Sequence, residues 1–165
     1  MMNLDQFNGL NEADAAALLY ECCHCHTWAS RVAGLRPFDS KEQLLRAADD
    51  VWRDADEAEI LEAFKGHARI GDIELLRSRY AGRATTEQGQ VMDASETVLQ
   101  ALYDLNIEYE RRYGFIFIVC ATGKSAEEML MLLKARIDNG RVMELMNGAH
   151  EQGSITRLRL VQLIQ

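Results

Sequence analysis

The chain has 165 residues, of which 48% are hydrophobic and 27% charged, and its formal net charge is −8. That length suits one globular domain, spanning 1–165, whose core needs neither disulfides nor metal ions to hold it together. The negative charge opposes binding to nucleic acid or to an anionic membrane, and no apolar run approaches the roughly 18 residues of a membrane span, so we expect a cytoplasmic protein with no nucleic-acid or membrane partner.

Capped helical patterns fill the N-terminal part of the chain. Asn11 precedes an alanine-rich run with acidic residues in its first turn, and Ser40 with Gln43 forms a capping-box pattern. Pro37 interrupts the helical pattern and requires an extended or turned link. These signals predict helices over 12–23, 28–34, 40–52 and 54–67.

The C-terminal part of the chain is also mainly helical in pattern, although 73–84 is ambiguous. A capping-box pattern at Thr85 begins the longest apolar stripe, which Gly114 closes, and Ser125 with Glu128 forms another capping box. The expected helices here are 85–114, 125–138, 141–154 and 155–165. The chain is therefore predicted to be all-α, a single-domain bundle of about eight helices.

The apolar run "FIFIVC", residues 115–120, stands apart from these helices. Its β-branched and aromatic residues suit a strand, but no second convincing strand is available to pair with it. We therefore expect a buried, extended connector whose backbone amides are free for another role.

Three of the four cysteines are crowded with two histidines into "CCHCH", residues 22–26. Structural zinc sites usually pair two ligand doublets a dozen or more residues apart, and no second doublet exists here. Reduced, packed cysteines are the favoured interpretation, and a metal site remains the alternative.

The stretch "CATGKS" resembles a phosphate-binding loop, but the glycine that such a loop needs five positions before Gly123 is Ile118. The pattern is therefore interpreted as the N-cap of the helix that starts after Ser125.

A stronger candidate is "GHARIGD", in which His67 lies between Gly66 and Gly71. The glycines permit unusual backbone angles and close approach of another molecule, and histidine suits proton transfer near neutral pH. The alternative is a loop with a surface histidine and Asp72 as a helix cap. The pattern alone leaves both open.

Two further segments carry candidate residues. Glu87 and Gln88 are either ordinary residues of a first helical turn or a carboxylate and an amide that face a pocket. Arg157 and Arg159 lie about 200° apart on one helix, so we expect one in solvent and the other turned towards a buried anion. Ile155, Leu158 and Val161 are expected to form the core stripe of that helix.

Taken together, "GHARIGD", "EQ", "YGFIFIVCATGKSAEEML" and "ITRLRL" resemble the OHCU decarboxylase family, where OHCU is 2-oxo-4-hydroxy-4-carboxy-5-ureidoimidazoline. The resemblance also covers "CCHCHTWASRVAGLRPF". It implies an all-α homodimer that uses no metal and no organic cofactor. It further implies cofactor-independent decarboxylation of a small anionic ureidoimidazoline to (S)-allantoin, in urate breakdown.

The same resemblance assigns roles to individual residues. It implies that His67 is the catalytic acid/base and that Glu87 is a second catalytic residue. The substrate-binding residues that it implies are Gln88, Arg159, Phe117, Ile118, Val119 and Ala68. Ala68 stands where the family has proline, and Ala84 stands where it often has serine, and both departures are expected to weaken substrate positioning.

Two other functions remain as alternatives. A non-enzymatic helical partner-binding module predicts no buried pocket joining residues 67, 87 and 159. A metal-dependent hydrolase built on "CCHCH" predicts tight, stoichiometric zinc.

Overall fold

The computed structural model of the chain describes residues 2–67, 74 and 89–165, the side chains of 89–95 excepted. This described part contains eight helices and no β-strand, so the all-α class is confirmed. The chain divides into two compact units, Met1–His67 with Asn147–Gln165, and Ala68–Met146. A single domain over 1–165 stays a prediction.

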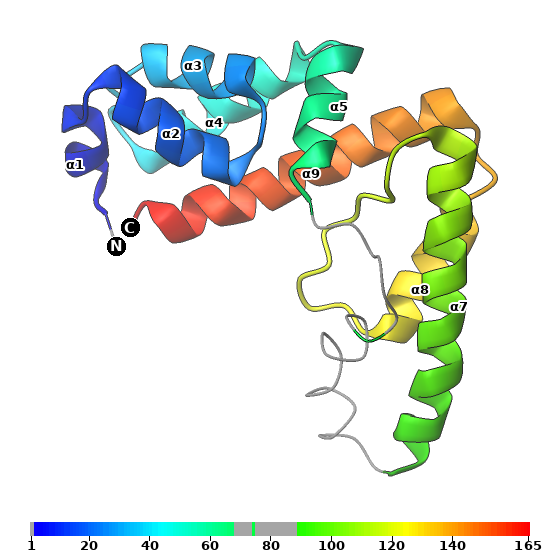
Figure 1. Cartoon of the computed structure of the whole chain (residues 1–165). Coiled ribbons are helices and arrows are strands. Elements are labelled where there is room, and N and C mark those ends of the chain that lie inside the picture. Colours follow the sequence, from blue (N-terminus) through cyan, green and yellow to red (C-terminus); the bar gives the residue numbers. More distant parts are fainter. Residues whose placement is uncertain (1, 68–73, 75–88) are drawn as a thin grey trace. The chain divides into compact units, whose positions relative to one another are not determined.

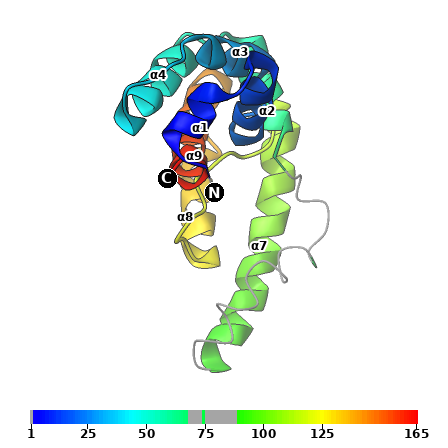
Figure 2. The same cartoon turned by 90° about the vertical axis from the view of Figure 1, so that its left-hand side faces the viewer.

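The first unit holds the N-terminal helices and most of the last helix (Figure 1). Its helices are α1 (Leu4–Gly9), α2 (Glu12–Cys22), α3 (His26–Gly34), α4 (Lys41–Arg53), α5 (Glu57–Lys65) and the part of α9 (Arg141–Leu163) from residue 147 onwards. The two chain ends lie side by side in both views (Figures 1 and 2), where Met2 and Ile164 form an isolated parallel bridge. The N-terminus is thereby fixed to the end of α9.

The predicted N-caps explain where these helices begin. The side chain of Asn11 accepts a hydrogen bond from the Asp14 amide, and that of Ser40 accepts one from the Gln43 amide. The capping box at Ser40 is only half formed, because the Gln43 side chain accepts from the Asp39 amide instead. Helix α1 was not expected from the sequence.

The main core cluster of the first unit draws apolar side chains from each of its helices, and α5 contributes Ala63 to this cluster and also buries Phe64. The fully buried members include Phe7, Leu19, Trp28, Leu44, Leu160 and Ile164. The indole nitrogen of Trp28 donates to the carbonyl oxygen of Ala48 at 3.0 Å, so its one polar atom is satisfied inside the core.

The second unit contains α7 (Gly89–Tyr113), α8 (Ala126–Arg136) and the first turns of α9. Helix α8 packs against α7, and Gly114 ends α7 with a φ of 76°. Residues 115–120 form no regular structure, and Phe115, Phe117 and Ile118 are buried. The expected buried connector is therefore confirmed.

Helix α9 corrects the expectation of two helices over 141–154 and 155–165, because it runs without interruption. Glycines weaken an isolated helix, and they suggested a break. Both glycines instead lie where another side chain of the unit packs closely against the helix, most tightly at Gly148. A Cβ on Gly148 would lie 2.7 Å from Cζ of Phe64, and one on Gly153 would lie 3.4 Å from Cδ1 of Trp52. Trp52 also donates to the carbonyl of Ala149 at 2.8 Å.

Candidate functional site

His67 lies two residues after the end of α5, and its amide donates to the carbonyl of Phe64 at 3.2 Å. Its side chain is half-buried. Atom Nε2 of the imidazole lies 2.5 Å from Oε1 of Gln152 on α9. The histidine is thus held against α9 and is not a free surface side chain.

The surroundings of His67 lower its pKa. Burial is the largest cause, because it disfavours the charged imidazolium, and the positive fields of Arg159 and His24 act in the same direction. The hydrogen bond to Gln152 partly opposes them. A neutral imidazole near pH 7 follows, which is the form that accepts a proton.

Gly66 serves close packing and needs no unusual backbone angle. Its φ of −75° is helical, but a Cβ there would lie 2.1 Å from Nδ1 of His24. The His24 ring stacks on Tyr20 with a centroid distance of 4.8 Å, and His26 stacks on the same tyrosine at 4.2 Å. The close approach that the glycine permits is therefore that of another ring of this chain.

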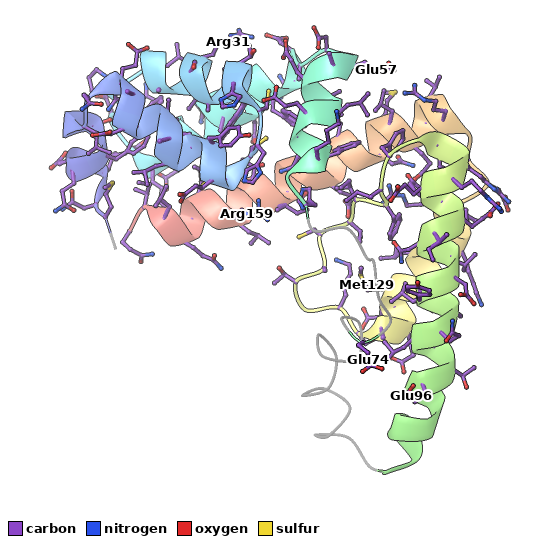
Figure 3. All side chains as sticks on the ribbon, viewed as in Figure 1. Arg31, Glu57, Glu74, Glu96, Met129 and Arg159 are labelled. Atoms are coloured by element: carbon purple, nitrogen blue, oxygen red, sulfur yellow. The ribbon has the colours of Figure 1, made fainter. Side chains whose placement is uncertain are left out.

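Arg157 and Arg159 of α9 separate as the helical spacing predicts. Arg157 is exposed and pairs with Asp49 at 3.7 Å. Arg159, labelled in Figure 3, is half-buried, and its Nη1 donates to the carbonyl oxygen of Cys22 at 3.1 Å. Arg159 is thus the cation on the same side of the unit as His67, whose pKa it lowers.

The core stripe of α9 differs from the expected one. Leu158 and Val161 are 39% and 38% exposed, so the predicted stripe is wrong. The buried positions recur every four residues instead and are Gln152, Thr156, Leu160 and Ile164. Two of them are polar, and hydrogen bonds compensate their burial.

These polar residues form a buried chain of hydrogen bonds that the sequence did not reveal. The amide nitrogen of Gln152 donates to Oγ1 of Thr156 at 3.0 Å. The Thr156 hydroxyl donates in turn to the carbonyl of Cys22 at 3.5 Å, which is the oxygen that Arg159 also contacts. The one available signal was the spacing of two polar residues four apart within a helix.

The cysteine cluster lies at the junction between the end of α2 and the start of α3. Cys22, Cys23 and Cys25 are buried free thiols, so the packed-cysteine interpretation is confirmed. Burial raises the pKa of Cys22 to about 11 and that of Cys23 to about 12, which keeps both thiols protonated and unreactive. Among the described residues, no three His, Cys, Asp or Glu side chains are grouped to hold a metal ion.

In the second unit, Arg136 holds the connector. Its guanidinium lies 4.5 Å from the centroid of the Phe117 ring, and its Nη1 donates to the carbonyl oxygen of Ile118 at 2.8 Å. Its Nε donates a hydrogen bond of 2.8 Å to Oε1 of Glu144, a residue that is fully buried. Glu144 also accepts from Tyr109 at 2.6 Å and from Asn139 at 2.9 Å.

The backbone amides of residues 117–119 make no hydrogen bond to the part of the chain that the structure describes. That agrees with the expected free donors. Further on, Lys124 donates to the carbonyl of Cys120 at 2.7 Å, and Ser125 with Glu128 forms the capping box of α8. The interpretation of "CATGKS" as a helix cap is therefore confirmed.

The other expected site residues, Ala68, Glu87 and Gln88, lie outside the described residues, as do Gly71 and Asp72. The structure brings His67 and Arg159 together within the first unit, and it places Phe117, Ile118 and Val119 in the second. No helix among those described is both long enough and apolar enough to span a membrane.

Comparison with known proteins identifies the family of the chain. A model of the OHCU decarboxylase family matches residues 8–161. The chain is 35% identical over 145 residues to the uric acid degradation bifunctional protein TTL of Arabidopsis thaliana, with 86% of this chain and 45% of that protein covered. The chain therefore spans less than half the length of that relative.

Two other relatives are matched over most of their own length. The 2-oxo-4-hydroxy-4-carboxy-5-ureidoimidazoline decarboxylase of Haloferax volcanii is 26% identical over 165 residues, with 98% of this chain and 95% of that protein covered. A crystal structure of OHCU decarboxylase in the presence of (S)-allantoin has a TM-score of 0.71 and 32% identity, with 87% of this chain and 94% of that chain covered. The chain belongs to the OHCU decarboxylase family.

Proposed function

We propose that the protein is a cofactor-independent carboxy-lyase that converts 2-oxo-4-hydroxy-4-carboxy-5-ureidoimidazoline into (S)-allantoin during urate breakdown. The observation that carries the proposal is a half-buried, neutral His67 held by Gln152, in a chain whose family acts on this substrate. The match to a solved decarboxylase over 94% of its length supports the same activity.

The chemistry explains why no cofactor is required. The substrate carries a carboxylate and a hydroxyl on one ring carbon. When the bond to the carboxylate breaks, CO₂ leaves and the electron pair enters the conjugated ring. The hydroxyl then becomes a carbonyl as its proton passes to the neighbouring ring carbon, and the ring nitrogen that received the electron pair takes up one proton from solution.

His67 is the acid/base in this proposal. A neutral imidazole takes the hydroxyl proton as the carbonyl forms, and the resulting imidazolium returns a proton to one face of the ring carbon. The lowered pKa suits both steps, because it keeps the base neutral beforehand and makes the imidazolium a ready donor. Delivery to one face gives the (S) product.

The remaining roles follow from the chemistry of each group. Arg159 supplies a positive charge that attracts the anionic substrate to a protein of net charge −8. Glu87 hydrogen-bonds the substrate hydroxyl or orients His67, and Gln88 pairs with ring or ureido groups. The backbone amides of 117–119 donate to the developing negative charge, as in an oxyanion hole. Ala68 lines the substrate next to His67.

Circular dichroism tests this function. Freshly generated substrate decays spontaneously to racemic allantoin, which has no optical signal. The proposal predicts that the protein, with or without a chelator, produces a signal of (S)-allantoin faster than that decay. Decay at the spontaneous rate, with racemic product, would favour the partner-binding alternative, and activity lost with the chelator would favour the metal-dependent one.

We also propose an oligomeric state and a cellular location for the protein. We propose a homodimer, supported by strongly exposed apolar side chains at the start of α9, where Val142 is 74% and Met146 is 67% exposed. A monomeric mass from light scattering would contradict it. A cytoplasmic location is supported by four free cysteines, as expected in a reducing compartment.

A further inference from the structure

The buried side of the His67 imidazole meets a side chain whose own hydrogen bonds fix which atom it presents. Gln152 is fully buried, and its amide nitrogen donates to Oγ1 of Thr156. The amide oxygen is therefore the atom that faces Nε2 of His67. A carbonyl oxygen only accepts hydrogen bonds, so Nε2 must carry the proton that is shared with it.

The direction of the hydrogen bond between His67 and Gln152 is set at the other end of the hydrogen-bonded chain, at the carbonyl of Cys22. The carbonyl oxygen of Cys22 has no hydrogen to give, so the Thr156 hydroxyl donates to it. With its single proton directed there, the hydroxyl oxygen accepts from Gln152. Arg159 donates to the same carbonyl oxygen, which therefore accepts two hydrogen bonds. The backbone of α2 therefore dictates the orientation of a side-chain amide on α9.

We infer that Gln152 is a positioning residue, which keeps the proton of neutral His67 on Nε2 and leaves Nδ1 to exchange protons with the substrate. The catalytic part of this inference rests on the proposed function, whereas the position of the proton does not. After CO₂ has left, the Nδ1 lone pair forms a bond to the hydroxyl proton while the O–H electrons form the carbonyl and the ring double-bond electrons move onto the neighbouring carbon. That N–H bond then breaks as the proton moves to the ring carbon.

The other groups facing His67 favour rapid exchange at Nδ1. Arg159 of α9 and His24, in the turn between α2 and α3, are the charged and titratable groups of the described residues that influence it, and neither is an acid. An imidazolium beside them gives up its second proton readily. Without Gln152, the neutral ring would be free to hold its proton on either nitrogen and to turn away from the orientation that presents Nδ1.

Nitrogen NMR of the histidine rings tests the position of the proton without any substrate. In wild-type protein above the pKa of His67, a long-range ¹H–¹⁵N spectrum should show a protonated Nε2 and an unprotonated Nδ1. A protonated Nδ1 in the wild type would overturn the inference, and this measurement does not depend on any variant folding.

Three variants extend the test, with exposed Gln162→Leu on the same helix as the matched control. Gln152→Leu should produce a mixture of the two ring forms, and isosteric Thr156→Val should produce a smaller loss of preference. Gln152→Glu places a carboxylate against Nε2, so His67 should remain protonated to higher pH by about one unit or more. Ring nitrogen signals that are unchanged in Gln152→Leu would contradict the positioning role.

Kinetics separate this inference from the proposed function. Gln152→Leu should lower kcat by about 10- to 100-fold, as for other residues that orient a functional histidine. KM should change by less than about threefold, because Gln152 is fully buried and acts through the imidazole. Loss of the proton preference with full kcat would refute the positioning role, whereas an inactive wild type with the proton on Nε2 would refute only the proposed function.

Discussion

At the scale of single residues, the surroundings of His67 suit the acid/base role that we propose for it. Its pKa lies below the ordinary histidine value because burial disfavours the imidazolium and because Arg159 and His24 repel a second positive charge. The histidine itself could be singled out from the sequence, because two glycines flank its motif. Gln152 could not, because a polar residue inside a helix is ordinarily exposed and carries no mark of burial.

The lowered pKa predicts the pH dependence of the reaction. In the proposed mechanism the neutral imidazole is the active form. As the pH is lowered, kcat/KM should therefore remain constant past the ordinary histidine pKa of about 6.5, and fall only when the pH passes through the lowered pKa of His67. A pH–rate profile measured by circular dichroism gives the midpoint. A midpoint above the ordinary value would contradict the described surroundings of His67.

Gly66 offers a prediction about packing beside the histidine. In Gly66→Ala, the new methyl group would meet the His24 ring, so we expect a loss of about 1–3 kcal/mol in the free energy of unfolding, measured in urea. Gly9→Ala is the matched control, because nothing lies within 4 Å of its added carbon. Equal stability of the two variants would show that the ring does not pack against Gly66.

At the scale of elements, the caps were predictable and the long-range packing was not. Asn11, Ser40 and Ser125 cap helices as expected, since a cap depends on residues three positions apart. The continuity of α9 was not predictable, because Gly153 contacts Trp52, a residue far away in the sequence. Arg136 and Glu144 were missed for the same reason.

The buried pair of Arg136 and Glu144 leads to a prediction for the second unit. Glu144→Ala leaves Arg136 without its carboxylate, so we expect a loss of about 3–5 kcal/mol in the free energy of unfolding and a less well held connector. Asp138→Ala, which removes an exposed partner of Arg112, should have a much smaller effect. Similar midpoints of chemical denaturation for the two variants would contradict this ranking.

At the scale of the whole molecule, composition and capping signals were enough to predict the all-α class, and the motifs were enough to predict the family. The charge of −8 argued against polyanionic partners but left a small anion open, provided that a local cation served it. Arg159 is that cation beside His67. Its partial burial could not be read from the sequence, because the apolar residues around it suggested a different buried face for α9.

The central claim is that His67 transfers protons during decarboxylation. The most direct test is the kcat of His67→Ala for formation of (S)-allantoin, compared with His150→Ala, an exposed histidine on α9. Loss of a proton-transfer group predicts a fall of about 10²–10⁴-fold for His67→Ala and no change for His150→Ala. A kcat of folded His67→Ala within a few fold of wild type would contradict the account.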